Sequence, residues 1–259
     1  MHDISAPRLV RAIIGDMRAS DAGGSVHEVL VERLGAAIVH GEHAPGARLI
    51  TAELGSDSGA SRSAAREAVR VLESLGLVRV RRRSGVEVRP ASEWNVYAPE
   101  VIRWRLGGPD RLRQLHELSQ LRGAIEPLAA RLAASEASEE QRRELTEAVA
   151  QMRRNAHAAD QQAYLDADIR FHRTLLAASG NPMLAALDEV VASVLVGRTQ
   201  HALMPHDADS EAVRLHRDVA FAVAGGDGDA AATAMAQIVS EADLAVQVMG
   251  EVGDPTRVG

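Results

Sequence analysis

The side chains best suited to holding a metal ion are one aspartate and two histidines in the C-terminal half of the chain. Asp168 and His172 are four residues apart in a stretch with helical spacing, so they lie about 40° apart around a helix axis. A carboxylate oxygen and an imidazole nitrogen on one helix face suit zinc, manganese, nickel or iron. His216 lies in a separate helical stretch and could complete a three-ligand site. The alternative is that the three side chains hydrogen-bond one another inside the domain.

A row of arginines offers a different chemistry, the binding of phosphate and base edges. Arg62, Arg66 and Arg70 recur every four residues after Ser61, and three more arginines follow at 81–83. From the first to Arg89 this stretch holds eight arginines and three glutamates, although the whole chain has a net charge of −7. A helix followed by a basic hairpin can enter the DNA major groove and contact the backbone beside it. The alternative is a solvated, charged helix face.

Charge and composition restrict the partners of the chain. Residues 25–90 have a net charge of +2 and residues 91–259 a net charge of −9, which predicts a basic module and an acidic one. With two residues each of Trp, Tyr and Phe, there is no stacking platform for single strands, so a nucleic-acid partner should be duplex. The absence of cysteine excludes disulfides and thiolate metal sites. No apolar run is long enough for a membrane span or signal peptide, which predicts a cytoplasmic protein without a membrane partner.

Two helices and a hairpin are predicted to position the arginines. Residues 1–24 have weak periodicity and predict a flexible arm. A capping-box spacing at Ser25 and Glu28 predicts a helix that stops near Gly41. Ser61 is predicted to cap a later helix, the one that carries the arginine row.

The remaining elements of the N-terminal module are short. An extended piece at Leu49–Ile50 and a brief helix at Ala52–Ser56 precede the arginine row, and two β-like runs, Leu77–Arg81 and Gly85–Val88, follow it. The pattern predicts a winged helix-turn-helix domain with a small β-hairpin wing over residues 25–90.

The C-terminal module is predicted to be entirely helical. A linker with a short helix occupies 91–109, a helical domain 110–250 and a flexible tail 251–259. The predicted helices are 111–135, 139–158, 160–179, 183–203, 210–224 and 228–249. An apolar stripe on the first of them is expected to be buried, and it consists of Leu115, Leu118, Leu121, Ile125, Leu128 and Leu132. The fold class is therefore mainly α, an antiparallel bundle of six or seven helices behind the winged module.

The N-terminal motifs resemble those of the GntR family of transcription regulators. They read GARLITAEL, then SRSAAREAVRVLESLGLV, then SGVEV. The resemblance implies that the DNA contacts come from Arg48, Ser61, Arg62 and Arg66, with Arg82 and Gly85 in the wing.

The C-terminal motifs resemble the FadR-like branch of that family, which has an all-helical effector (FCD-type) domain. These motifs are ELSQLRGAIEPLAARLAA, DADIRFHRTLLAASGN and LHRDVAFAVAGGDGDAA. In metal-binding relatives, one aspartate and three histidines converge, which implies a divalent metal (Zn, Mn or Ni) on Asp168, His172 and His216. The usual fourth ligand has no counterpart, because residues 237–240 contain no histidine. The segment EWNVYAPEVIRWRL is similar to a subgroup that responds to sugar acids.

Four side chains are candidates for contacting an effector. By resemblance, Arg122 would clamp a carboxylate through a two-pronged hydrogen-bond fork; the alternative is an intrahelical pair with Glu126, worth about 0.2–0.5 kcal/mol. Arg173 and Arg198 are further candidates. Asn181, between Gly180 and Pro182, either caps the next helix or contributes to the pocket.

The resemblance predicts a ligand-responsive regulator, not an enzyme. A homodimer would bind a pseudo-palindromic operator in double-stranded DNA, because two-fold protein symmetry requires a two-fold site. A small carboxylate, such as a sugar acid, would change its DNA affinity, with repression as the default. Two alternatives remain: a regulator that senses an acyl thioester, which needs a long apolar tunnel, and a metal-dependent enzyme in the helical domain.

Overall fold

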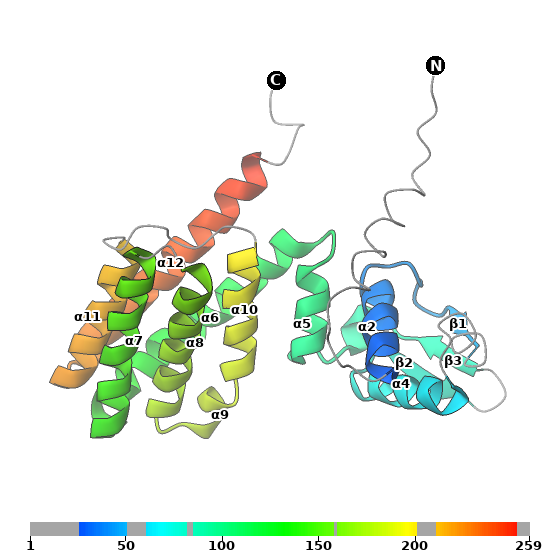
Figure 1. Ribbon diagram of the computed structural model, residues 1–259, viewed down its shortest axis with the longest axis horizontal. Helices are drawn as coiled ribbons and strands as arrows, with labels where there is room; N and C mark the ends of the chain where they lie inside the picture. The colour runs from blue at the N-terminus through cyan, green and yellow to red at the C-terminus, as the bar shows by residue number, and fades with distance from the viewer. Residues whose placement is uncertain (1–25, 51–60, 82–84, 158–159, 201–210, 253–259) are drawn as a thin grey trace, which may run out of the picture. The chain divides into compact units, whose positions relative to one another are not determined.

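Figure 1 shows the computed structural model of the chain, which describes residues 26–50, 61–81, 85–157, 160–200 and 211–252. The chain divides into two compact units, the first made of Met1–Ile38 and His43–Glu93, the second of Val39–Glu42 and Trp94–Gly259. Each unit has its own buried apolar side chains. The fold class is mainly α with one small sheet, as predicted. The predicted arm at 1–24, the brief helix at Ala52–Ser56 and most of the tail lie outside the described residues.

The first helix of the N-terminal unit, α2 (Val26–Val39), packs through one side. Leu30, Leu34 and Ile38 recur every four residues and are buried, which is the spacing that places side chains on a single helix face. Gly41 follows with a φ of 84°, a conformation that glycine adopts without steric cost and that ends the helix.

The arginine row lies on α4 (Arg62–Ser74), and the predicted serine cap is present. The Ser61 hydroxyl accepts a hydrogen bond from the backbone N–H of Ala64 at 3.1 Å. This satisfies one of the N–H groups that the first helical turn leaves without a partner. Ala65, Ala68 and Leu72 are buried, so the helix packs on its small and apolar face and exposes the arginines.

A three-stranded antiparallel sheet completes the N-terminal unit. Its strands are β1 (Arg48–Leu49), β2 (Val78–Arg81) and β3 (Gly85–Val88), in the order β1-β3-β2. The predicted hairpin is therefore confirmed, and the extended piece before the arginine row pairs with its second strand. Gly85 has a φ of 84°, and a Cβ there would lie 2.9 Å from the carbonyl oxygen of Leu49. The close approach of β1 to β3 therefore requires glycine.

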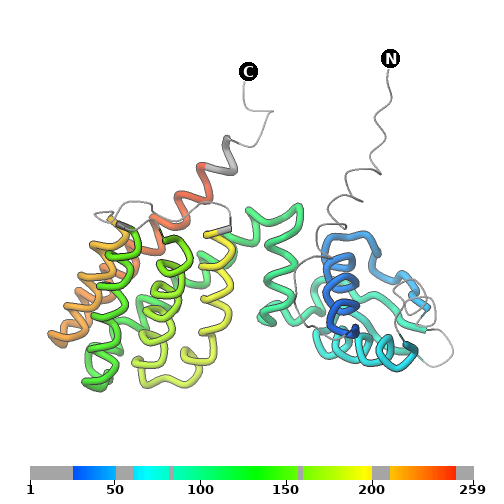
Figure 2. Tube along the Cα trace, in the orientation of Figure 1, coloured from blue at the N-terminus to red at the C-terminus, as the bar shows by residue number. Residues whose placement is uncertain are grey.

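The second unit is an all-helical bundle within the described residues (Figures 1 and 2). After the short 3₁₀ helix η1 (Ala91–Glu93) of the first unit, its helices are α5 (Pro99–Leu106), α6 (Arg111–Glu136), α7 (Glu139–His157), α8 (Gln161–Ala178), α9 (Pro182–Ala185), α10 (Asp188–Gln200), α11 (Glu211–Gly225) and α12 (Gly228–Val252). Helix α8 packs against α6, α7 and α10, and α6 packs along α12. Side chains that point inward from α6 and α8 therefore meet in the interior of the bundle.

The first compact unit and the predicted domain at 25–90 have different limits, because the unit leaves out Val39–Glu42 and continues to Glu93. The sequence assigns all of 25–90 to the first domain, whereas Val39–Glu42 groups with the second unit. In that unit, His40 Nε2 lies 2.8 Å from the backbone carbonyl oxygen of Trp104 in α5. No local sequence pattern specifies this contact, because the two residues are distant in sequence.

The predicted single helix at 183–203 is wrong. The chain forms α9 and α10 with a turn at residues 186–187. The N–H of Leu187 bonds to the carbonyl of Leu184 at 3.1 Å, a tight i−3 bond that closes the first helix. Leu184 and Leu187 then pack into two different apolar clusters, and one straight helix would not direct both side chains in this way.

The apolar stripe predicted on α6 is also partly wrong. Leu115 and Leu118 are buried, but Leu128 is 47% exposed. Ala129, Ala130 and Ala133 are buried in its place. Small side chains allow neighbouring helices to approach closely. Ala130 and Ala133 pack with side chains of α12, and Ala129 packs in a second cluster with side chains of α8. Among the described residues, no helix is both long and apolar enough to cross a bilayer.

Candidate functional site

A basic groove lies between α4 and the wing of the first unit. Its lining residues are Arg62, Arg66, Val69, Arg70, Glu73, Val80, Arg81, Gly85 and Val86, and its volume is about 780 Å³. One wall is formed by α4 and the other by the β2–β3 hairpin. A groove with cationic walls on a winged unit is suited to the phosphates and base edges of duplex DNA.

The arginines of this groove differ in how they are paired. Arg70 bonds to Glu67 at 3.2 Å and Arg81 to Glu87 at 2.5 Å. Arg66 donates through Nε to the backbone carbonyl of Arg62 at 3.3 Å, and neither Arg62 nor Arg66 has a carboxylate partner among the described residues. Their cationic groups are therefore available to an external anion.

The other predicted DNA contacts occupy several positions in the same unit. Arg48 lies exposed on β1, opposite Glu87 in the sheet register. Ser61 is the helix cap, and Gly85 lines the groove. Arg82 lies outside the part of the chain that the structure describes.

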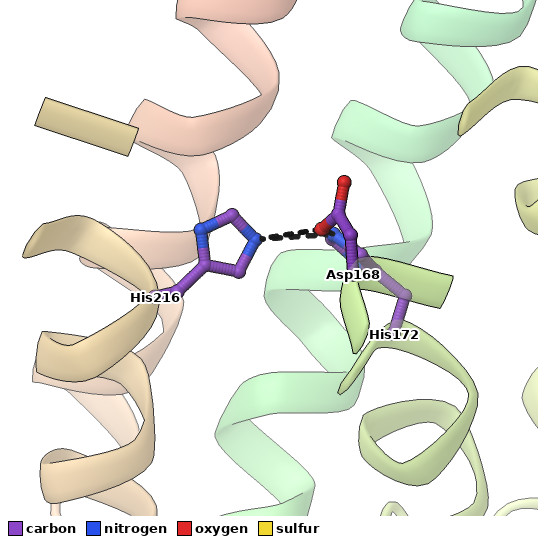
Figure 3. A group of neighbouring side chains, drawn as sticks. All are labelled: Asp168, His172 and His216. Atoms are coloured by element: carbon purple, nitrogen blue, oxygen red, sulfur yellow. Dashed lines mark hydrogen bonds and ion pairs between the residues drawn. The ribbon is translucent and has the colours of Figure 1, made fainter. Parts of the chain in front are cut away.

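In the second unit, the three predicted metal ligands converge in the interior (Figure 3). Asp168 and His172 come from α8 and His216 from α11, and each is at most 3% exposed. Asp168 Oδ1 lies 3.3 Å from His172 Nε2 and 3.2 Å from His216 Nε2. The two Nε2 atoms are 3.4 Å apart. The three potential ligand atoms thus form a small, nearly equilateral triangle.

The triangle has the dimensions that a metal ion requires. Ligand atoms bound tetrahedrally at about 2.0–2.1 Å are about 3.3 Å from one another. His216 Nδ1 lies 2.6 Å from the carbonyl oxygen of Ala212. Because that oxygen only accepts, Nδ1 carries a proton, and Nε2 is the ring atom that can bind a metal ion. The three residues therefore fit a zinc-type ion with a fourth position left over. Residues 237–240 add no ligand, since the buried side chains there are Ile238 and Val239.

An ion pair on α6 supports this cluster. Arg122 donates to Glu126 through Nε at 2.9 Å and through Nη2 at 3.1 Å, and both side chains are at most 1% exposed. Glu126 Oε2 also lies 3.3 Å from His172 Nδ1. A carboxylate behind a histidine ring orients it and raises its basicity as a ligand. The intrahelical Arg122–Glu126 pair, which was the alternative predicted for Arg122, is therefore present and is also a part of the buried site.

The charges in the cluster stabilise one another. Burial alone would raise the pKa of Glu126, but Arg122 and His172 outweigh it and lower that pKa to about 2. Burial would also raise the pKa of Asp168, which the neighbouring His172 and His216 side chains instead hold well below its ordinary value. For His172, burial lowers the pKa, but Glu126 and Asp168 produce a net increase. Both carboxylates are therefore ionised at neutral pH.

Two further side chains of the bundle interact electrostatically with the cluster. Burial and the nearby charge of Arg122 lower the pKa of Arg198 on α10 to about 10. Burial and the carboxylate of Asp168 raise the pKa of Tyr164, one turn before it on α8. Tyr164 is not among the residues predicted from the sequence, although its four-residue spacing from Asp168 could have indicated it. The contact between Glu126 and His172 is not among them either, because no local pattern signals it.

The remaining effector candidates lie apart from the cluster. Arg173 pairs with Asp188 and Glu189 and is 42% exposed. The Asn181 side chain accepts a hydrogen bond from the N–H of Met183 at 2.9 Å and caps α9. In this structure, then, Arg122 and Arg198 are the effector candidates that belong to the cluster.

Each of the two units matches a known family of protein domains. The model for bacterial regulatory proteins of the gntR family matches residues 27–88, and the FCD domain model matches residues 117–241. The chain is 30% identical to the galactonate operon transcriptional repressor of Escherichia coli K12 over 82% of this chain and 92% of that protein. It is also 30% identical to the uncharacterized regulator YieP of the same organism, over 83% and 93%. A solved structure of Lar from Listeria monocytogenes shares the fold, with a TM-score of 0.55, 19% identity and coverage of 88% of this chain and all of that one.

A winged helix-turn-helix unit with a basic groove, joined to a helical unit with a buried polar site, defines a ligand-responsive DNA-binding transcription regulator. The chain belongs to the GntR family of transcription regulators, and its C-terminal unit is an FCD domain.

Proposed function

We propose that this regulator represses a catabolic operon and is released from DNA by a small carboxylate, a sugar acid above all. The observation that carries the proposal is the buried cluster of Asp168, His172 and His216 beside two guanidinium groups. The relative with galactonate in its name supports the sugar-acid class, because the chain spans 92% of that protein. A small, polar sugar acid suits a small charged cluster better than an acyl thioester does, because the acyl chain needs an apolar tunnel.

The guanidinium groups support recognition of a carboxylate. Arg122 uses Nε and Nη2 on Glu126, and its buried Nη1 has no hydrogen-bond partner among the described residues. A buried donor without a partner is costly, so an acceptor from a ligand would stabilise it. Arg198 brings a second positive charge toward Arg122, which is one reason that its pKa falls. An anion bound between them would relieve that repulsion.

We further propose that Asp168, His172 and His216 hold a divalent ion, since their ligand atoms lie at tetrahedral separations. When bound, such an ion supplies a Lewis-acidic fourth position for a carboxylate or hydroxyl oxygen. Within the chain, Glu126 orients His172 and the Ala212 carbonyl orients His216. These supports pre-organise the ligands on α8 and α11.

Effector binding and DNA binding are thermodynamically coupled in the proposed mechanism. We propose a homodimer whose two winged units bind the halves of a pseudo-palindrome. An effector that binds one arrangement of the dimer better than another must change DNA affinity by the same coupling free energy, typically about 1–3 kcal/mol. For a repressor of a catabolic operon, the effector-bound arrangement is the one with weaker DNA affinity.

Galactonate is expected to raise the melting temperature of the wild-type protein, and Arg198→Ala is expected to weaken its binding about 10-fold or more, since a hydrogen bond to a charged group contributes about 1.5–3 kcal/mol. Arg173→Ala is the matched control, because Arg173 pairs with Asp188 and Glu189 outside the cluster. Thermal denaturation with and without galactonate measures the first effect, and titration calorimetry with galactonate, gluconate, a dicarboxylate and octanoyl coenzyme A measures the second. Heat from the acyl thioester alone, or equal binding by Arg198→Ala and the wild type, would contradict the proposal.

Removal of metal is expected to destabilise the protein. A zinc ion present at 100 times its dissociation constant adds about 2.7 kcal/mol to the free energy of unfolding. Denaturation of the wild-type protein with zinc and with a chelator should differ by about that amount. For His216→Ala, which lacks one ligand, the two curves should nearly coincide. Coincident curves for the wild type would show that the cluster is instead held by its own hydrogen bonds.

A further inference from the structure

The three glutamates of the basic stretch have different partners. Glu67 pairs with Arg70, and Glu87 pairs with Arg81. Glu73 lines the same groove but has no cationic partner among the described residues. Its carboxylate Oε1 accepts a hydrogen bond from the backbone N–H of Val80 at 2.8 Å. A negative charge in a groove that faces phosphates opposes DNA binding, so attraction of DNA does not explain its presence there.

The hydrogen-bond pattern of the wing makes this N–H available. Strand β2 is an edge strand, because the sheet order is β1-β3-β2. The N–H of Arg89 bonds to the carbonyl of Leu77 at 2.8 Å. In an antiparallel ladder the bonded residues alternate, so Arg79 and Arg81 also bond toward β3. The N–H of Val80 therefore points to the outer edge, where nothing in the sheet can pair with it.

Glu73 connects the recognition helix to the wing at this edge. It lies in the last turn of α4, and Val80 lies in the middle of β2. Between them, the chain turns at Gly76, which has a φ of 77°, and Leu77 N–H bonds to the carbonyl of Leu72 at 3.0 Å. The side-chain bond closes this turn from the groove side. It therefore joins the two walls of the groove directly.

We infer that Glu73 is a positioning residue for DNA recognition, which acts through the Val80 N–H and not by touching DNA. With the bond in place, Arg62 and Arg66 on α4 and Arg81 on β2 are held in one relative arrangement. Without it, β2 has a free edge and the wing moves relative to the helix. Specific binding needs both walls at once, whereas non-specific binding needs only positive charge. Glu73 thus contributes to specificity although its charge lowers general affinity for DNA.

Three substitutions at this position separate the hydrogen bond from the charge. Glu73→Gln keeps an acceptor oxygen at the same reach and removes the charge. Glu73→Ala removes both, and Glu73→Asp keeps the charge but shortens the side chain by one methylene. Glu67→Ala is the control, because it removes a glutamate of the same helix that pairs with Arg70 and has no bond to the wing among the described residues. The probe is a duplex selected from a random-sequence pool by the full-length wild-type protein, compared with an unrelated duplex by fluorescence anisotropy.

Glu73→Ala and Glu73→Asp are expected to raise the dissociation constant for the selected duplex about 10-fold, about 1.4 kcal/mol, with unrelated DNA bound as well as or better than by the wild type. Glu73→Gln should stay within about 3-fold of the wild type. Amide exchange at Val80 should accelerate in Ala and Asp variants and not in Gln. Loss of affinity in Glu73→Gln equal to that in Glu73→Ala, or wild-type behaviour of both Ala and Asp variants, overturns the inference. The inference about Glu73 rests on the proposed function. If the wild-type protein selects no duplex, the proposed function itself is refuted.

Discussion

Replacing both Arg62 and Arg66 by alanine is expected to weaken binding to the operator about 100-fold or more, because each arginine that contacts a guanine edge contributes about 1–3 kcal/mol. Both lie on the exposed face of α4, at its start and one turn later, and line the groove. Neither has a carboxylate partner among the described residues, so no internal ion pair must be broken before they bind DNA. Fluorescence anisotropy at fixed salt concentration gives the dissociation constants.

The control for this prediction is an arginine of similar exposure in the helical unit. Arg143 lies on α7 within 3.8 Å of Glu140 and 3.7 Å of Glu147. Arg143→Ala should leave the dissociation constant unchanged within about 2-fold, since exposed ion pairs contribute little. If the loss in the double variant is larger for the operator than for unrelated DNA, the two arginines contact bases; an equal loss indicates phosphates. Operator affinity that survives the double substitution would refute the assignment of α4 as the recognition helix.

Glu126→Gln is expected to lower the free energy of unfolding by about 3–5 kcal/mol, the cost of leaving a buried partner charge without compensation. Glu126 is fully buried, accepts two hydrogen bonds from Arg122 and lies beside His172. Glutamine has nearly the same shape, so the loss reports charge rather than volume. Chemical denaturation of wild type and variant measures the difference. Glu147→Gln, 60% exposed at an ion pair with Arg143, should change stability by less than about 1 kcal/mol.

The pH dependence provides an independent check on Glu126. Its pKa is about 2 in the folded protein and 4.5 as an ordinary value. A carboxyl group with a lowered folded pKa stabilises the fold above its unfolded pKa, and that contribution is lost as the pH falls toward the folded pKa. The stability difference between wild type and Glu126→Gln should therefore be largest near neutral pH and should narrow below about pH 4.5. A difference that does not change with pH in this range would contradict the ionised Arg122–Glu126 pair.

The features that the sequence predicted well are those that depend on neighbours along the chain. A serine before a helical pattern predicted the cap of α4, because the hydroxyl needs only the N–H three residues later. The four-residue spacing of Arg62 and Arg66 predicted a shared exposed face, and that of Asp168 and His172 a shared buried face. The two β-like runs around the basic tip predicted the hairpin, since antiparallel strands joined by a short turn pair locally.

Features that depend on the meeting of distant segments were predicted poorly or only by resemblance. The apolar stripe predicted that Leu128 is buried, but alanines form the buried face of α6. The sequence pattern predicted one helix over 183–203, but the chain turns there, and Leu184 and Leu187 pack in two different apolar clusters. It gave no sign that Glu126 would lie behind His172, because the two are 46 positions apart on different helices. The relation of His216 to Asp168 came from the family resemblance, not from spacing.

By itself, therefore, the sequence determined the local elements of this protein: its helix cap, its arginine row, its hairpin and the i, i+4 pair on α8. Hydrogen bonds and side-chain faces within one or two turns set these features, so they can be derived from neighbouring residues. Only the tertiary structure decided which faces meet, and hence that α6, α8 and α11 place Arg122, Glu126, Asp168, His172 and His216 in one buried cluster. The physical reason is that helix packing depends on the fit of whole surfaces, which the period of a single helix does not specify.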